Sequence, residues 1–437
     1  MRASPARVVA HRVLLRVTEE GAFADRAFRA EADRARLDPR ERAFAQQLAY
    51  GSVQRLAALD HVLAELADRP LDRIDPPVRD AIRLGLFQLL WMDSVPDRAA
   101  VEQTVELAKL SSRAAGGFAN AVMRRAAREA RGLLEEAPQA VRESHPEWIV
   151  RMWSDALGPA ETAALLARDN EPPESAVRAN ELRTTRESLR RELAELGVES
   201  HDAPGLPEGL VLGTPFDVHG SEAFARGELM PQSRSSMLVA RVLGPQPGER
   251  ELDLCAAPGA KATHIAALMD GRGSVVAVEH NERRAAELAE NAERLGASSV
   301  EVLARDAREP VEPGGFDRVL LDPPCSDLGT LQSRPDARWR KTPEQVEELA
   351  TVQAELLESA AAQVGRGGTL VYSTCTISPD ENERRVAAFL ESHPDFAADD
   401  LGAERPELAS AADGRFLQVL PHRHGTDGFF IGRLNRR

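Results

Sequence analysis

The stretch Leu252-Asp-Leu-Cys-Ala-Ala-Pro-Gly-Ala-Lys261 ends a short apolar strand, passes through a loop and opens a helix. Further apolar runs follow it, with helix-like segments between them. This alternation predicts a doubly wound α/β sheet of parallel strands. Right-handed crossovers place the carboxyl ends of such strands along one edge, where ligands bind. The expected strands are 252–254, 275–278, 300–303, 319–321 and 369–372, the expected helices are 260–269, 282–295 and 343–364, and residues 415–434 add two strands.

The loop after the first strand favours a cofactor without phosphate groups. Its Ala, Pro and Gly residues let the backbone approach a ligand closely. Neither a P-loop nor a GxGxxG pattern is present, which disfavours a dinucleotide. Glu279 ends the second strand, where a carboxylate suits the two hydroxyls of a ribose. Asp306 follows the third strand and could accept a hydrogen bond from an adenine amino group. Together these features favour S-adenosylmethionine (SAM).

Two cysteines follow the predicted fourth and fifth strands. Cys325 stands in Leu321-Asp-Pro-Pro-Cys-Ser326, a rigid ledge whose carboxylate, Asp322, can hydrogen-bond a flipped base. Cys375 stands in Ser373-Thr-Cys-Thr-Ile-Ser-Pro-Asp-Glu-Asn-Glu383. A single cysteine of this kind is ordinarily a small buried hydrophobe. Two of them at the tips of strands beside a SAM pocket favour chemistry.

The chemistry that needs two thiols is the methylation of carbon 5 of cytosine. Carbon 5 is a poor nucleophile, but a thiolate that adds to carbon 6 turns the ring into an enamine and makes carbon 5 reactive. After methyl transfer, the proton on carbon 5 must leave and the enzyme thiol must be expelled, so the site needs a second group. A nearby cation such as Lys261 could lower the pKa of the attacking thiol.

Composition excludes several other classes of protein. The chain has 437 residues, of which 43% are hydrophobic and 29% charged, as in soluble globular proteins. It has no apolar run of about 18 residues and no signal peptide at its N-terminus, so we expect a cytoplasmic protein without membrane contact. Its three cysteines, Cys255, Cys325 and Cys375, are odd in number and widely spaced, which argues against disulfides and against a metal site.

The charge is unevenly distributed along the chain. The net charge is −15, yet residues 1–131 contain 22 Lys and Arg against 18 Asp and Glu, a net charge of +4. The overall acidity is therefore only weak evidence against a nucleic-acid substrate. Arg124, Arg125, Arg128 and Arg131 lie on adjacent turns of a predicted helix. They form either a solvated face or a stripe that contacts phosphates.

Periodicity divides the chain into three predicted domains. Residues 1–135 form an all-helical domain, 136–235 a small α+β subdomain and 236–437 the catalytic domain. Apolar residues recur at helical spacing in the first domain at 8–17, 43–53, 56–66, 78–91 and 99–110. In the subdomain we expect a helix near 147–167, a short strand at 175–179 and a helix near 185–196.

Two sets of motifs resemble known families. RERAFAQQLAYGSVQR, VRDAIRLGLFQLLWMDSVP, AVEQTVELAK and GFANAVMRRAAR, all within the first domain, resemble the NusB-type RNA-binding helical domain. LDLCAAPGAK, LDPPCS and YSTCTISPDENE, in that order, resemble the Sun (RsmB) family of bacterial RNA cytosine-5 methyltransferases, and the likeness covers essentially the whole chain. It implies a class I SAM-dependent methyltransferase fold, a Rossmann-like doubly wound sheet behind a NusB-like domain, with 16S rRNA as substrate.

Carried over to matching positions, the resemblance implies that Cys375 is the nucleophile and that Cys325 assists product release, with Lys261 and Asp322 beside them. It also implies contacts to SAM from Cys255, Ala256, Ala257, Pro258, Gly259, Ala260, Lys261, Glu279, Asp306 and Asp322. Cys255 is then a residue that lines the pocket. Two positions depart from the family: Ala260 replaces a glycine, and Glu279 replaces an aspartate. Alanine would be strained at positive φ but is harmless in a helix.

The main prediction is a monomeric, metal-free 16S rRNA (cytosine-C5)-methyltransferase. A transfer RNA substrate would use the same chemistry and stays open. A noncatalytic RNA-binding or ribosome-assembly factor is less favoured, because both thiols, Asp322 and Lys261 are intact. A DNA cytosine methyltransferase is less favoured too, because it would attack through the cysteine after the fourth strand and would leave the NusB-like domain unexplained.

Overall fold

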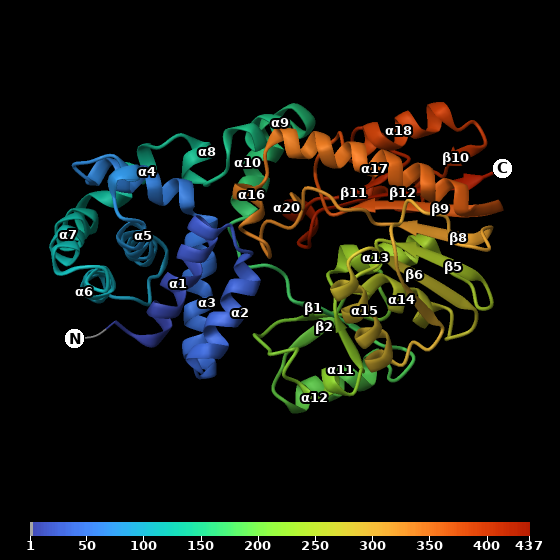
Figure 1. Cartoon of the computed structure of the whole chain (residues 1–437), viewed down its shortest axis with the longest axis horizontal. Coiled ribbons are helices and arrows are strands. Elements are labelled where there is room, and N and C mark those ends of the chain that lie inside the picture. The colour runs from blue at the N-terminus through green and yellow to red at the C-terminus, as the bar shows by residue number, and fades with distance from the viewer. Residues whose placement is uncertain (1–2) are drawn as a thin grey trace. The chain divides into compact units, whose positions relative to one another are not determined.

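The computed structural model describes residues 3–437, and their contacts divide into two compact units. One unit runs to residue 171 and also contains residues 331–341, and the other contains residues 172–330 and 342–437. Figure 1 shows helices in the first unit and two sheets with surrounding helices in the second. Between residues 3 and 437, no helix is long and apolar enough to cross a membrane.

The first unit is all-helical, as the sequence predicts. Its principal helices are α1 (Pro5–Glu20), α2 (Ala24–Ala35), α3 (Pro39–Gln54), α4 (Leu56–Leu66), η1 (Leu71–Arg73), α5 (Pro76–Trp91), α6 (Asp97–Ala108), α7 (Arg113–Glu136), α8 (Gln139–Arg142), α9 (Glu147–Leu157) and α10 (Pro159–Arg168). Pro39 and Pro76 occupy the first position of α3 and α5, where a missing N–H costs nothing. The apolar faces of α1 to α7 pack into one core.

Two features of this unit differ from the expectation. The single helix expected near 147–167 is two helices, because Gly158 adopts φ +83° and Pro159 begins a new helix. The short helix α2 was not expected, because apolar spacing in this segment is supplied mainly by alanines such as Ala27 and Ala32. Small residues bury little area, so they leave a weak periodic signal.

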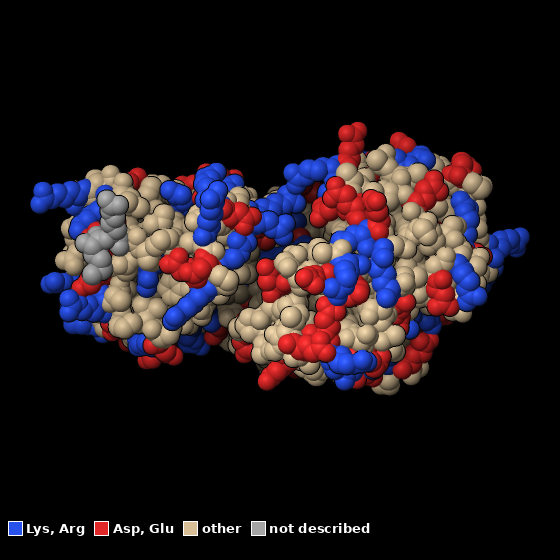
Figure 2. Space-filling view, turned by 90° about the horizontal axis from the view of Figure 1, so that it is seen from below, with Lys and Arg blue, Asp and Glu red and all other residues tan. Residues whose placement is uncertain are grey.

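The arginines of α7 divide into two kinds. Arg125 and Arg131 donate hydrogen bonds to the backbone carbonyls of Leu66 (2.9 Å) and Leu89 (3.1 Å), which join α7 to α4 and α5. Arg124 and Arg128 are exposed, and so is Arg131 in spite of its hydrogen bond to α5. Figure 2 shows basic side chains standing out from the surface of the molecule among patches of both signs. Part of the arginine stripe is therefore structural, and part is available to solvent.

A segment from the second half of the sequence belongs to the helical unit. Residues 331–341 contain the short helix α16 (Ala337–Arg340). Arg338 is fully buried and donates to the backbone carbonyls of Ser144 at 3.2 Å and Asp169 at 3.1 Å. The indole Nε1 of Trp339 donates to the carbonyl of Val53 at 2.7 Å. The helical unit is thus completed by residues far along the chain.

The second unit begins with a small antiparallel sheet. Its strands are β1 (Ala176–Ala179), β2 (Ser200–Asp202), β3 (Gly209–Leu212) and β4 (Leu229–Pro231), in the order β2-β3-β1-β4. The helices α11 (Arg186–Glu195) and α12 (Glu222–Ala225) accompany it. Leu189 and Leu193 of α11 pack on Val177 and Leu210 of the sheet, which forms a small separate core. The expected strand and second helix of the α+β subdomain are confirmed.

The large sheet confirms the predicted doubly wound architecture. Its strands are β5 (Arg250–Leu254), β6 (Ser274–Glu279), β7 (Val300–Ala304), β8 (Phe316–Leu321), β9 (Val364–Thr374), β10 (Phe396–Ala398), β11 (Leu417–Val419) and β12 (Phe429–Arg436). The order is β10-β12-β9-β8-β5-β6-β7, with β11 paired to β12. Strands β5 to β9 run parallel, and β12 lies antiparallel to β9. The chain builds outward from β5 in both directions, so a ligand-binding switch point lies between β5 and β8.

Helices cover both faces of this sheet. Figure 1 shows α13 (Arg234–Leu243), α14 (Ala260–Leu268) and α15 (Glu282–Leu295) on one face, and α17 (Pro343–Gln363) and α18 (Glu383–Ser392) on the other. Alternate residues of each strand enter the two cores: Val275 and Ala277 face α14, whereas Val276 and Val278 belong to the core of α17. Shorter elements follow at α19 (Leu401–Glu404), η2 (Pro406–Leu408) and α20 (Pro421–His424).

Candidate active site

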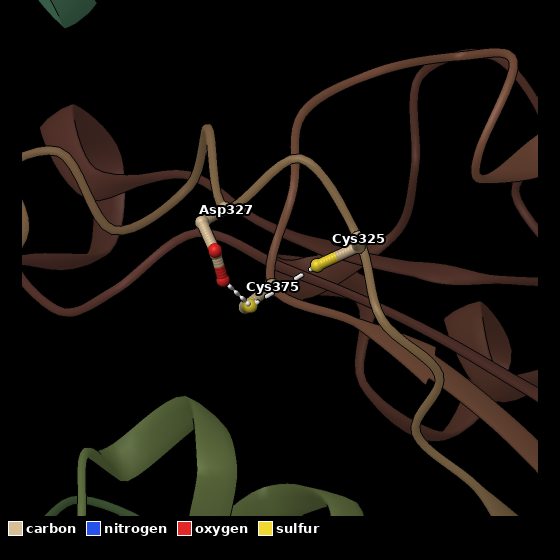
Figure 3. A group of neighbouring side chains, drawn as sticks. All are labelled: Cys325, Asp327 and Cys375. Atoms are coloured by element: carbon tan, nitrogen blue, oxygen red, sulfur yellow. Dashed lines mark hydrogen bonds between the residues drawn. The ribbon is translucent and has the colours of Figure 1, made fainter. Parts of the chain in front are cut away.

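The two predicted thiols meet at the carboxyl edge of the sheet. Cys325 lies on the loop after β8, and Cys375 directly follows β9. Their sulfur atoms are 3.2 Å apart, and the Sγ of Cys375 also donates a hydrogen bond to Oδ1 of Asp327 at 3.2 Å. Figure 3 shows the side chains of Cys325 and Asp327 converging on Cys375 from the same loop. Neither cysteine forms a disulfide among residues 3–437, and Cys325 is the more deeply buried.

A buried carboxylate ties the two cysteine loops together. Glu381 accepts hydrogen bonds from the backbone N–H of Ser326 at 2.8 Å and from its hydroxyl at 2.5 Å. The hydroxyl of Ser326 also lies 2.6 Å from that of Thr376, the residue after Cys375. Gln353 of α17 donates to Glu381 at 3.0 Å and to the carbonyl of Pro324 at 2.9 Å. Burial raises the pKa of Glu381. The network connects the residues that follow each cysteine.

Lys261 and Asp322 form an ion pair beside the thiols. The Nζ of Lys261, in the first turn of α14, donates to Oδ2 of Asp322 at 2.6 Å. The other oxygen of Asp322 accepts from the hydroxyl of Ser373 at 2.9 Å. Burial alone would lower the pKa of Lys261, but Asp322, with smaller contributions from Cys375 and Asp253, holds that pKa above its ordinary value. Lys261 is therefore a cation held by Asp322 that interacts electrostatically with Cys375.

The loop between β5 and α14 has the close-packed backbone that the sequence predicts. Gly259 adopts φ +100°, and a Cβ there would approach Cγ of Leu288 to 3.2 Å. Ala260 is the first residue of α14, so the alanine at this position is unstrained. The hydroxyl of Thr263 donates to the carbonyl of Gly259 at 2.7 Å. Burial raises the pKa of the Cys255 thiol, which agrees with a lining residue and not with a nucleophile.

The carboxylates along the edge differ in their surroundings. Glu279 is 2% exposed and accepts from the backbone N–H of Asn281 at 2.9 Å, with Arg284 at 3.4 Å. Asp306, at the tip of β7, is bound by the side chain and backbone of Arg308, which lowers the pKa of Asp306 to about 2. The structure therefore places Asp306 in an ion pair at the outer strand, apart from the cluster around the thiols.

Three further polar residues belong to this edge, although the sequence did not single them out. Asp253 of β5 is 1% exposed, and neither carboxylate oxygen has a hydrogen-bond partner among residues 3–437. Burial raises its pKa to about 8. Asp327 and Glu381 complete the set. Each lies inside or next to a motif, but only its contacts separate it from the neighbouring acidic residues.

Comparisons with family models match three regions. The model for 16S rRNA methyltransferase RsmB/F matches residues 240–435, the NusB family matches 4–128, and the RsmF/B-like ferredoxin-like domain matches 145–219. The last match corresponds to the small antiparallel sheet and the helices before it. Together the three models cover most of the chain, in the order that the motifs predict.

Comparisons with individual proteins extend over the full length. The chain is 37% identical to "Probable ribosomal RNA small subunit methyltransferase B" of Synechocystis sp. over 99% of both chains, and 36% identical to the Bacillus subtilis protein of the same name over 100% of both. Among solved structures, PH0851 has a TM-score of 0.85 at 28% identity over 100% of both chains. NSun6 from Pyrococcus horikoshii, solved with SFG, has a TM-score of 0.61 at 25% identity and covers 67% of this chain and 99% of its own. The chain therefore belongs to the RsmB/F family of 16S rRNA methyltransferases.

Proposed function

We propose that this protein transfers the methyl group of SAM to carbon 5 of a cytosine in 16S rRNA. The observation that carries the proposal is the pair of thiols, 3.2 Å apart, at the tips of β8 and β9. Cytosine-5 chemistry needs one thiol to attack and a second group to release the product. Membership of the RsmB/F family supports the substrate, because the named relatives act on RNA of the small ribosomal subunit.

The residues along the edge fit SAM. This cofactor supplies an electrophilic methyl group when it is bound. The buried carboxylate of Asp253 has no hydrogen-bond partner among the described residues, and it suits the cationic amino group of the methionine part. Glu279 at the end of β6 suits the ribose hydroxyls, and the backbone of residues 255–260 lets a ligand approach closely. SFG, which accompanies NSun6, is an analogue of SAM, and this supports the assignment.

The complete set of proposed cofactor contacts is Cys255, Ala256, Ala257, Pro258, Gly259, Ala260, Lys261, Glu279, Asp306 and Asp322, and we add Asp253 to it. Within this set, Asp306 is the least accessible to a ligand, because the side chain of Arg308 already donates to both of its oxygens. An adenine amino group would have to share the carboxylate with this guanidinium. We therefore expect Asp306 to contribute less to SAM affinity than Asp253 or Glu279.

Cys375 is the proposed nucleophile. Its sulfur adds to carbon 6 of cytosine, and the electrons of the carbon 5–carbon 6 double bond become available at carbon 5 to accept the methyl group. Lys261 favours the negative charge that develops on sulfur during this attack. Asp322 fixes Lys261, and its position on the Asp-Pro-Pro ledge suits the pairing edge of a flipped base.

Cys325 is the proposed residue for product release. After methyl transfer, carbon 5 carries both a methyl group and a proton. As a thiolate, Cys325 can take this proton, whereupon the double bond re-forms and the bond from Cys375 to carbon 6 breaks. The 3.2 Å separation of the two sulfurs brings the second thiol to the carbon next to the one attacked. Without Cys325, the covalent intermediate should persist.

The proposal also covers the oligomeric state, the cellular location, the metal content and the roles of the domains. We propose that the protein works as a monomer in the cytoplasm, where its rRNA substrate is made. We also propose that it needs no metal. The thiols and Asp327 offer three ligand atoms within 4.8 Å of one another, but a metal held there would block both thiols, which the proposed chemistry uses. In this proposal the domain at 1–135 binds RNA and the domain at 236–437 carries out catalysis. The subdomain at 136–235 links these two domains and contributes to RNA binding.

The test combines an activity assay with a map of the modified base. The protein is incubated with tritiated SAM and either 16S rRNA or small subunits from cells that lack the gene. Bisulfite sequencing of rRNA and tRNA from the same cells then locates the missing 5-methylcytosine. We expect incorporation into 16S rRNA and loss of one rRNA position. Loss of a tRNA position instead would assign the activity to tRNA, and no incorporation into either RNA would contradict the proposal.

A further inference from the structure

Asp327 touches the reacting sulfur, and neither the motifs nor the proposed mechanism uses it. Its Oδ1 accepts a hydrogen bond from the Sγ of Cys375 at 3.2 Å. Figure 3 shows the carboxylate reaching toward that sulfur from the side opposite Cys325. Both contacts to the nucleophile thus come from one loop, whose residues Cys325 and Asp327 are two positions apart. The second contact calls for its own chemical explanation.

The backbone holds Asp327 in an unusual conformation. Its φ is +61°, in the left-handed region that residues other than glycine rarely adopt. The N–H and hydroxyl of Thr330 both donate to the carbonyl of Asp327, at 3.0 and 2.9 Å. The N–H of Gly329 donates to the carbonyl of Cys375 at 3.0 Å, which fastens the loop to the tip of β9. A strained residue that its surroundings fix in place is a frequent feature of functional sites.

Cys375 therefore lies between groups of opposite charge. Lys261 favours the thiolate, whereas a carboxylate at hydrogen-bond distance disfavours it in the resting enzyme. A group whose only role was to lower the pKa of the thiol would be cationic. A carboxylate in direct contact with the S–H is suited to a different task, which is to receive the proton at the moment when sulfur attacks.

We propose that Asp327 is the general base that accepts the proton of the Cys375 thiol, an inference that rests on the proposed function. In the attack, the S–H electron pair forms the bond from sulfur to carbon 6. The proton moves to Oδ1 of Asp327, and the electrons of the ring double bond shift toward carbon 5. In release, the bond from sulfur to carbon 6 breaks, its electrons return to sulfur, and Asp327 returns the proton. The proton that leaves carbon 5 is the one the overall reaction sets free.

The test replaces Asp327 with asparagine or glycine, both of which tolerate positive φ. Asp270, which also has a positive φ of +54° and whose carboxylate accepts from Arg272 at 3.0 Å, supplies the matched control Asp270→Asn. Two rates are measured at pH 7. The first is the rate of covalent adduct formation with target RNA and SAM in a Cys325→Ala background. The second is the rate at which iodoacetamide alkylates Cys375, followed by mass spectrometry.

The two rates should change in opposite directions. Loss of the base should slow adduct formation by about 10²-fold or more, in both Asp327 variants. Loss of the negative charge should favour the thiolate, so alkylation of Cys375 should become several-fold faster. Asp270→Asn should change neither rate. An unchanged rate of adduct formation would overturn the inference, as would a fall in both rates, which would indicate a displaced loop.

The design separates this inference from the function on which it rests. Cys375→Ala should remove the adduct entirely in either case. If the Cys325→Ala parent forms no adduct, the covalent mechanism itself is wrong, and the role of Asp327 falls with it. If the parent forms the adduct and Asp327→Asn forms it at the parental rate, the proposed function stands and only the role of Asp327 is refuted.

Discussion

The two halves of the carboxyl edge of the large sheet differ in how their buried acids are bonded. Near the cofactor loop, Asp253 has no hydrogen-bond partner for either oxygen among residues 3–437. Behind the thiols, Glu381 accepts hydrogen bonds from Ser326 and Gln353, and its own carbonyl accepts from the hydroxyl of Tyr372 at 2.7 Å. We call the half around Asp253 the incomplete half, because this carboxylate lacks hydrogen-bond partners. We call the half around Glu381 the saturated half, because this carboxylate has several.

This difference reflects what each half does. An unpaired buried carboxylate is costly, and a ligand that supplies a cationic donor removes the cost. The incomplete half is therefore suited to binding. The saturated half holds two sulfurs in one geometry before any substrate arrives, and such preorganisation favours catalysis. The comparison predicts that variants in the saturated half, which holds the thiols, affect turnover. Variants in the incomplete half, which holds the cofactor loop, should affect SAM binding.

The largest expected effect comes from Cys375→Ala. Methyl transfer should fall below detection, because no other thiol can attack carbon 6 from this position, while SAM affinity should change little. Tritium incorporation into unmethylated rRNA and isothermal titration calorimetry with SAM measure the two quantities. Asp270→Asn is the control, because Asp270 pairs with Arg272 and belongs to neither half of the proposed site. Full activity in Cys375→Ala would contradict the expectation that the thiols of the saturated half carry the chemistry.

The next effect is the trapping expected for Cys325→Ala. This variant should form the covalent adduct but release it slowly, so protein linked to RNA should accumulate when SAM is present. A denaturing gel reveals the adduct as a slowly migrating band that nuclease removes. The double variant Cys325→Ala/Cys375→Ala should give no such band. Rapid turnover by Cys325→Ala would show that another group releases the product.

A smaller effect is expected for Glu381→Gln. One of its contacts to the cysteine loops should weaken, and a displacement of about 1 Å at a reacting group can lower the rate by about 10²-fold. SAM affinity should stay the same. Glu383→Gln is the matched control, because Glu383 is half-buried and also has a raised pKa but accepts from Ser410. Equal losses in the two variants would mean that burial, and not the link between the loops, matters.

The smallest effect on turnover is expected for Asp253→Asn, which tests the incomplete half. Losing a charged hydrogen bond of about 1.5–3 kcal/mol should weaken SAM binding by about one to two orders of magnitude, with little change in the maximal rate. Calorimetry gives the affinity. A large fall in the maximal rate at saturating SAM would place Asp253 in the chemistry and remove the distinction between the halves.

The same residue predicts how stability depends on pH without SAM. The pKa of Asp253 is raised from 3.8 to about 8, so between these values the folded protein holds a proton that the unfolded chain has lost. Asp253 therefore makes the free energy of unfolding fall with rising pH, by up to about 1.4 kcal/mol per unit. Asp253→Asn should flatten that slope between pH 4 and 8 in urea titrations. A slope equal to that of the parent would argue against the raised pKa.

The local elements of the fold could be predicted because each follows from a short-range pattern. The five parallel strands are apolar runs, and their helices begin at ordinary start signals such as Pro343. The elements that escaped prediction lack such a pattern. Residues 331–341 join the helical unit through Arg338 and Trp339, which donate to the backbone carbonyls of Ser144 and Val53, far away in the sequence. No local sequence pattern predicts such a partner.

The residues of the site also divide into those that a local pattern predicts and those that depend on distant contacts. By itself, the sequence determined that two cysteines, a lysine and a set of acids come together, because residues after parallel strands share one edge of a sheet. Only the tertiary structure decided which acids matter and how. Asp253 lacks a hydrogen-bond partner among residues 3–437. Asp327 contacts a sulfur 48 positions away, and Glu381 bonds to residues 28 and 55 positions away. Contacts across that separation depend on packing, which strand and helix periodicity does not encode.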